Sequence, residues 1–148
     1  MIKTRTDVAI VAGQLGSWTL ILLLSNFEYV LTTTYLKVIL GVGISLTIVG
    51  ALTLGAKTYS SSTKPRVTNV MTQKGLYRYL RHPIYLGLLI AGLAFLLSKP
   101  TIQAGLAYFL LMLFTNIRAD LEEVMLEEKH PEYTNYKKST KRYIPFMY

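Results

Sequence analysis

The sequence predicts an all-α integral membrane protein with four transmembrane helices and a cytoplasmic C-terminal helical extension. Composition supports this class, because 51% of the residues are hydrophobic and only 16% are charged, whereas soluble proteins average about 25% charged residues. The apolar residues are also gathered into four segments rather than spread along the chain. A length of 148 residues predicts a single domain.

The first two apolar segments are long enough to span a bilayer, which takes roughly 20 residues. Residues 8–24 carry no charge, and residues 36–56 carry a single lysine near one edge. A cleaved signal peptide is the alternative for the first segment, because basic residues precede it. We expect the helix to be retained, since residues 25–28 (SNFE) lack the small-x-small pattern of a cleavage site.

The third and fourth apolar segments form a predicted helical hairpin. They cover residues 84–98 and 101–117, and Lys99-Pro100 between them requires a tight turn. The fourth helix is expected over about residues 101–126, because apolar residues continue at helical spacing among glutamates. It should end near His130, since the residue before a proline disfavours the α conformation.

Lysine and arginine are distributed unevenly between the two ends of these predicted helices. Fourteen fall in residues 1–7, 57–83 and 118–148, against two, Lys37 and Lys99, at the other end. The positive-inside rule therefore places both termini and the middle loop in the cytoplasm, at the cell inner membrane or an equivalent membrane. Topology and anionic lipid explain the net charge of +8. No nucleic-acid partner is expected, because no binding motif accompanies the dispersed charges.

The Ser- and Thr-rich stretch 57–74 is predicted to be an exposed loop, and it leads into Arg81-His82-Pro83. Proline is tolerated in the first turn of a helix, so the third helix should begin at Pro83 with His82 at or near its cap. The free N–H groups there attract anions, and the neighbouring arginines add charge. The 15 apolar residues of the third helix cover only about 23 Å of a ~30 Å hydrocarbon core. The anion-attracting pocket at the start of this helix should therefore lie within the membrane boundary. The alternative is that Arg78, Arg81 and the tyrosines around them only anchor the helix at the membrane interface.

Glu122 and Glu123 form a second cluster, which the hairpin returns to the same end as the start of the third helix. Carboxylates there could receive an amino group or ribose hydroxyls of an anionic cosubstrate. The alternative is a solvated helical face with an Arg118–Glu122 ion pair at i,i+4. Three further residues could cover such a site or serve only as interfacial anchors: Tyr133, Tyr136 and Arg142.

Two sequence blocks resemble the signature of the isoprenylcysteine carboxyl methyltransferase and phospholipid methyltransferase superfamily. They are "MTQKGLYRYLRHPIYLG" and "RADLEEVMLEEKHPEYTNYKKSTKRYIP", within about residues 65–146. The matching positions of the first block are Gly75, Tyr77, Arg81, His82, Pro83, Tyr85 and Gly87. Those of the second block are Glu122, Glu123, Tyr133, Tyr136, Arg142 and Pro145.

The resemblance implies an integral membrane methyltransferase that uses S-adenosylmethionine, bound by residues 72–87 and 118–146. Its acceptor would be a lipophilic molecule dissolved in the membrane, either an isoprenoid carboxylate or a lipid amine, and no metal is expected. The implied cofactor-binding residues are Gly75, Tyr77, Arg81, His82, Pro83, Tyr85, Glu122, Glu123, Tyr133 and Tyr136. The implied catalytic residues are Arg118, Arg142 and Glu123. Arg118 or Arg142 would orient the acceptor. Glu123 or His82 could take a proton from an amine acceptor.

Two other functions remain open at this point. Membrane sterol reductases have a similar Arg-His-Pro region and bind a reduced nicotinamide cofactor there, although they are much longer. A non-catalytic membrane lipid-binding protein is the second alternative. Lipid amines, isoprenoid acids and small hydrophobic thiols all remain open as acceptors, and the residues do not indicate an oligomeric state.

Overall fold

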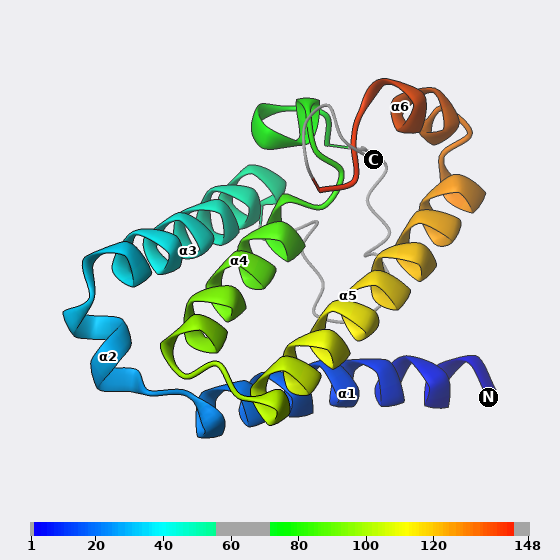
Figure 1. The fold of residues 1–148 in the computed structure, drawn as a ribbon. Coiled ribbons are helices and arrows are strands. Elements are labelled where there is room, and N and C mark those ends of the chain that lie inside the picture. The colour runs from blue at the N-terminus through cyan, green and yellow to red at the C-terminus, as the bar shows by residue number, and fades with distance from the viewer. Residues whose placement is uncertain (1, 56–71, 144–148) are drawn as a thin grey trace.

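In the computed structural model, residues 2–55 and 72–143 are described, with the backbone alone for residues 2–7. These residues form helices and one isolated β-bridge, as the all-α prediction requires (Figure 1). Most of the predicted loop 57–74 and the C-terminal Pro145 lie outside the described residues. The elements are α1 (Ile2–Leu24), α2 (Phe27–Thr32), α3 (Thr34–Leu54), the 3₁₀ helix η1 (Gly75–Arg78), α4 (Pro83–Ser98), α5 (Ile102–Lys129) and α6 (Tyr133–Ser139).

The predicted helical hairpin is confirmed at both of its ends. Helix α4 begins at Pro83 with His82 as its N-cap, because a proline at the first helical position sacrifices no hydrogen bond. After the tight turn, the Thr101 hydroxyl accepts a hydrogen bond from the Ala104 N–H at 3.2 Å and starts α5. Helix α5 ends at Lys129, and His130 is its C-cap.

Three features of the N-terminal half and the C-terminal segment were not predicted. Helix α1 begins at Ile2 rather than at residue 8, because charged residues do not prevent a helix from extending beyond its apolar part. A short helix, α2, follows it and is started by Asn26, whose side chain accepts from the Tyr29 N–H at 2.9 Å. Near the C-terminus, Tyr133–Ser139 form the two-turn helix α6.

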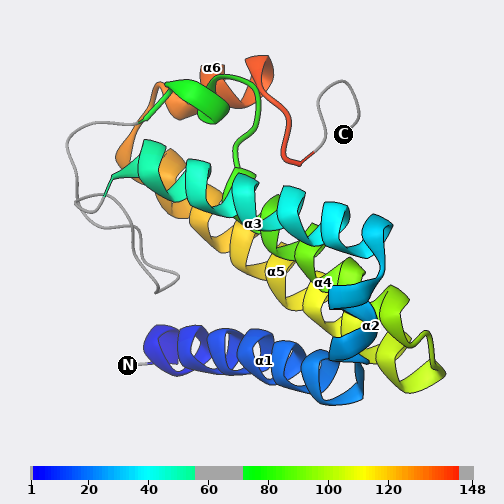
Figure 2. The same cartoon turned by 90° about the vertical axis from the view of Figure 1, so that its left-hand side faces the viewer.

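Helices α3 and α4 pack with their backbones in close contact, side by side in both views (Figures 1 and 2). A Cβ atom added at Gly43 would lie 2.5 Å from the Ala91 nitrogen and 2.7 Å from the Gly87 oxygen. Only a residue without a side chain allows the two helices to approach this closely. This contact places the N-terminus of α4 beside the C-terminal end of α3.

The apolar core lies at the end of the bundle where α4 turns into α5. It consists of Ile21, Val30, Leu36, Phe95, Ala107 and Leu111. Helix α2 lies at this end, and α1 meets the other helices there and is inclined to them (Figure 2). The opposite end of the bundle, where η1 and α6 lie, contains the charged groups described below (Figure 1).

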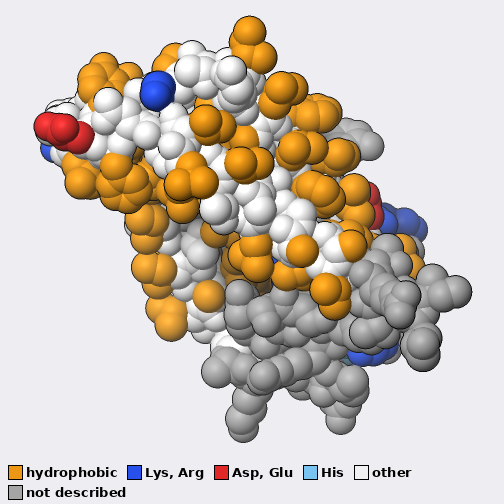
Figure 3. All heavy atoms as spheres, turned by 90° about the horizontal axis from the view of Figure 1, so that it is seen from below, with side chains coloured by type: hydrophobic (Ala, Val, Ile, Leu, Met, Phe, Trp, Pro, Cys, Tyr) orange, Lys and Arg blue, Asp and Glu red, His pale blue; other side chains and the backbone are white. Residues whose placement is uncertain are grey.

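Large hydrophobic side chains gather on the described helices on the face that Figure 3 shows. Examples are Leu23, Leu52 and Ile102, which are 76%, 76% and 82% exposed. Exposed large apolar side chains on so many helices are typical of a surface that contacts a membrane or a partner. Helices α3 and α5 are long and apolar enough to cross a membrane, whereas the apolar part of α1 (Val8–Leu24) and α4 are shorter.

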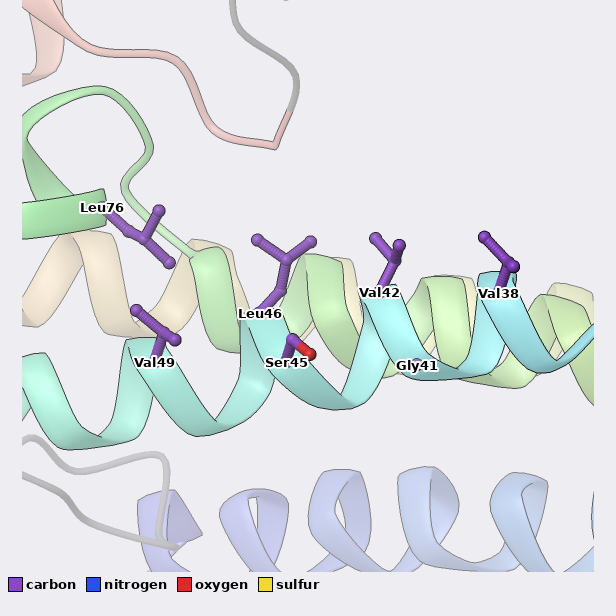
Figure 4. Close-up of a pocket in the computed structure, with 7 residues that line it drawn as sticks. All are labelled: Val38, Gly41, Val42, Ser45, Leu46, Val49 and Leu76. Atoms are coloured by element: carbon purple, nitrogen blue, oxygen red, sulfur yellow. The ribbon is translucent and has the colours of Figure 1, made fainter.

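The outer face of α3 also forms a shallow apolar groove of about 490 Å³ (Figure 4). It is lined by Val38, Gly41, Val42, Ser45, Leu46, Val49 and Leu76. All but Leu76 belong to α3, and the side chains of Val38, Val42 and Leu46 point to the same side of this helix in the close-up. This face suits contact with lipid chains.

The close contact between α3 and α4 predicts that Gly43→Ala destabilises the protein by about 1–3 kcal/mol, because overpacking forces the helices apart. The measurement is the thermal unfolding midpoint in detergent. Gly41→Ala is the matched control, since a Cβ at Gly41 meets nothing within 4 Å. It should be neutral or slightly stabilising, and equal effects of the two variants would contradict the packing described.

Candidate active site

One buried carboxylate, that of Glu123 on α5, is the centre of the charged end of the bundle. Glu123 is only 1% exposed. Its Oε1 accepts from Arg81 Nε at 3.0 Å and from Arg142 Nε at 3.2 Å, and lies 3.1 Å from His82 Nε2. Its Oε2 lies 3.2 Å from Lys137 Nζ. A buried carboxylate needs such partners, because leaving it unpaired would cost many kcal/mol.

Backbone hydrogen bonds bring the segment after α6 against the residues before α4. The Arg81 N–H donates to the Lys141 carbonyl at 2.8 Å, and the His82 N–H donates to the Arg142 carbonyl at 3.2 Å. The Lys141 N–H donates in return to the Tyr79 carbonyl at 3.1 Å. These bonds form a short parallel bridge, so Arg142 and His82 approach Glu123 from adjacent backbones.

The Arg81 guanidinium connects Glu123 to the end of α6. Besides the bond to Glu123, its Nη1 donates to the carbonyls of Lys137 and Thr140 at 3.1 and 2.6 Å. The last carbonyls of a helix have no partner within the helix, and a guanidinium satisfies them well. Arg81 therefore both pairs with a carboxylate and holds α6 in place.

Glu122 lies beside this centre and is more accessible, with 19% of its side chain exposed. The Tyr85 hydroxyl donates to Glu122 Oε1, and Glu122 Oε2 lies 3.9 Å from His82 Nδ1. Arg118 Nε lies 3.6 Å from Glu122 Oε1, the predicted i,i+4 pair. The rings of His82 and Tyr85 stack at 5.3 Å, and the Arg118 guanidinium lies 5.5 Å from the centre of the Tyr85 ring.

The two tyrosines of α6 are buried and tie this helix to η1. The Tyr136 hydroxyl donates to the Tyr77 carbonyl at 2.6 Å. Burial raises the pKa of Tyr136 to about 12, so this hydroxyl keeps its proton at physiological pH. Tyr133 is 2% exposed, and its ring lies 5.5 Å from that of Tyr136. Tyr136 thus ties α6 to η1, and Tyr133 packs beside it.

Gly75 and Pro83, two of the predicted cofactor-binding residues, have clear structural reasons for their identity. Gly75 has a φ of +56°, which favours glycine, and an added Cβ would lie 3.0 Å from Thr53 Cγ2. Pro83 starts α4 and packs against Gly50 of α3. Their contribution is to place the backbone that presents Arg81 and His82.

Several charged residues of the cluster were missed by the sequence analysis. Asp120 accepts from Arg142 Nη2, and Lys137 Nζ pairs with Glu127 Oε1 at 3.0 Å as well as with Glu123. The hydrogen bond with Glu127 raises the pKa of Lys137 and keeps it charged. The signal was present in the spacing, because residues 120, 123 and 127 share one helical face at steps of three and four.

A polar cavity of about 450 Å³ opens at this cluster. It is lined by Arg81, Asp120, Glu123, Lys137, Lys138, Thr140, Lys141 and Arg142. Within the described part of the chain, the buried Tyr143 hydroxyl has no hydrogen-bond partner. Glu123 Oε2 is also buried, and it pairs with Lys137 Nζ at 3.2 Å. Of the predicted cofactor-binding residues, Arg81 and Glu123 line the cavity.

Comparison with known proteins identifies the family. The model of the isoprenylcysteine carboxyl methyltransferase family matches residues 35–128. The chain belongs to this family. No curated protein and no solved structure matches it. The matched range contains Arg81, His82, Glu122 and Glu123 but neither α1 nor α6. Membership makes the protein a membrane methyltransferase.

The burial of Glu123 predicts that Glu123→Gln lowers the free energy of unfolding by about 3–5 kcal/mol, because the remaining cations would repel one another. Thermal unfolding in detergent measures this loss. The control is Glu128→Gln, on an exposed position of the same helix, which should change stability by no more than about 0.5 kcal/mol. A Glu123→Gln variant as stable as the control would contradict the central role of this carboxylate.

Proposed function

We propose that the protein transfers a methyl group from S-adenosylmethionine to a lipophilic acceptor dissolved in the membrane, an isoprenoid carboxylate or a lipid amine. The observation that carries the proposal is the meeting of the adjacent acids of α5 with Arg81-His82 at the start of α4, within the part of the chain that matches the family. The binding region would comprise residues 72–87 and 118–146.

The residues present fit the cofactor by the chemistry of their donors and acceptors. S-adenosylmethionine has an amino group and ribose hydroxyls, which suit Glu122, and a carboxylate, which suits the cations around Glu123. The cavity of about 450 Å³ falls within the usual range of roughly 300–1,000 Å³ for small-molecule sites.

When bound, the cofactor supplies a methyl group that is already activated as part of a sulfonium. The protein therefore needs mainly to orient the acceptor and to exclude water. For a carboxylate acceptor, the forked guanidinium of Arg118 or Arg142 would orient the oxygens. No proton needs to be removed from such an acceptor.

An amine acceptor must lose a proton, and His82 is better suited to accept it than Glu123. An ionised carboxylate can only accept hydrogen bonds, so the contact with Glu123 Oε1 requires a hydrogen on His82 Nε2. In the neutral ring, Nδ1 then carries the lone pair. Glu123 would thus act by fixing the His82 tautomer, and its own Oε1 is already surrounded by donors.

We place the four long helices α1, α3, α4 and α5 across the membrane, with both chain termini in the cytoplasm. Two of them satisfy the length and hydropathy of a membrane span, and the apolar parts of the other two are shorter. The charged cluster lies at one end of the bundle, as an interfacial site requires. Its position would let a water-soluble cofactor meet an acceptor that enters from the lipid.

The first test is binding of S-adenosylmethionine to the protein in lipid nanodiscs, measured by calorimetry. Glu122→Gln should weaken binding by about 10- to 100-fold, because a hydrogen bond to a charged group contributes about 1.5–3 kcal/mol. Glu128→Gln should bind as the wild type does. Stabilisation by NADPH and not by S-adenosylmethionine would favour a reductase instead, and no effect of either would favour a lipid-binding protein.

The acceptor is identified by incubating the protein with radiolabelled S-adenosylmethionine and total membrane lipid, followed by analysis of the labelled product. The proposal predicts that base releases the label as volatile methanol if the acceptor is a carboxylate, and that the label stays on nitrogen through base treatment if the acceptor is an amine. Absence of any labelled lipid with cofactor bound would contradict methyl transfer to a membrane-dissolved acceptor.

A further inference from the structure

A buried polar contact joins α1 to α5 below the charged cluster, in a part of the fold that the family match does not include. Gln14 lies in the middle of the apolar stretch of α1 and is only 4% exposed. Its partners on α5 are Thr115, which is fully buried, and Arg118, which is 9% exposed. Buried polar residues in membrane helices are costly and usually functional.

Both ends of the Gln14 amide are held by neighbouring turns of α5. Gln14 Oε1 accepts from Arg118 Nη1 at 2.8 Å, and Gln14 Nε2 donates to the Thr115 hydroxyl at 3.1 Å. Because the amide oxygen accepts and the amide nitrogen donates, these two contacts fix its orientation. The Arg118 guanidinium is therefore fixed from the side of α1.

The position of Arg118 along α5 makes this hydrogen bond important. The residue lies about 24 Å along the helix from Ile102, which is short of the ~30 Å of a hydrocarbon core. Helical side chains lean toward the N-terminus of their helix, here toward the membrane interior. An arginine near a boundary ordinarily extends its charge out to water, but Gln14 draws this one inward.

The same guanidinium reaches the proposed active site. It lies 5.5 Å from the centre of the Tyr85 ring, and its Nε lies 3.6 Å from Glu122 Oε1. Gln14 is thus the far end of a polar connection that runs from the interior of α1 to residues beside the cofactor region.

We propose that Gln14 is a positioning residue that holds Arg118 inside the membrane boundary, where Arg118 meets the polar group of the acceptor. The inference rests on the proposed methyl transfer. It makes α1 a part of the acceptor site, although the family match begins after that helix. The competing role, in which Gln14 only packs α1 against α5, is distinguished by the experiment below.

The test measures methyl transfer from radiolabelled S-adenosylmethionine to total membrane lipid by Gln14→Met, which has a similar volume and no amide. The expected result is a fall of at least about tenfold in kcat/KM for the lipid, mainly through a higher apparent KM. Cofactor affinity measured by calorimetry should stay within about twofold of wild type. Ser17→Ala is the matched control, because Ser17 is a buried residue on α1 whose hydroxyl donates to the Gly13 carbonyl of its own helix.

The outcomes separate this inference from the proposed function. A wild-type protein that binds the cofactor and labels no lipid would refute both proposals. A wild type that labels lipid, with an equally efficient Gln14→Met variant, would refute the positioning role alone. Should Gln14→Met fail to fold, the same assay on Thr115→Val tests the inference, because this variant removes the partner of the Gln14 amide nitrogen. A lower kcat/KM for the lipid supports the positioning role, and an unchanged kcat/KM overturns it.

Discussion

The burial of one carboxylate, that of Glu123, determines how the charged end of this protein is built. A carboxylate almost without solvent contact is stable only if donors surround it. Those donors come from two separate places in the chain, Arg81 and His82 before α4 and Lys137 and Arg142 in and after α6. The requirement therefore draws the C-terminal segment back onto the start of α4.

The two ends of the bundle are stabilised by different physical means, and this division explains where chemistry is possible. At one end, apolar side chains around Phe95 and Leu111 make a dry core. At the other end, paired charges, a polar cavity and a stacked His82–Tyr85 pair lie next to a lipid-compatible surface. Under the proposed function, a polar cofactor and a lipophilic acceptor would meet at this boundary.

Much of the fold that presents the site could be predicted from local chemistry. Pro83 marks the start of α4, Lys99-Pro100 marks the hairpin turn, and Pro131 marks the end of α5. A hairpin necessarily returns Glu122 and Glu123 to the level of His82, so their proximity followed from topology.

Other parts of the site depend on tertiary packing that no local pattern records. The partners of Gln14 are more than 100 positions away in the sequence. The contact of Lys137 with Glu123 depends on the angle at which α6 leaves α5. The pairing of residues 79–82 with 141–142 has no strand pattern, because it consists of only a few hydrogen bonds between two loops.

Photo-crosslinking tests the central claim most directly. Radiolabelled S-adenosylmethionine is irradiated with the protein in nanodiscs, and the labelled peptides are mapped. Label is expected within residues 72–87 or 118–143, and excess S-adenosylhomocysteine should remove it. Label confined to α1–α3, or label that the competitor does not remove, would contradict a cofactor site at the buried carboxylate.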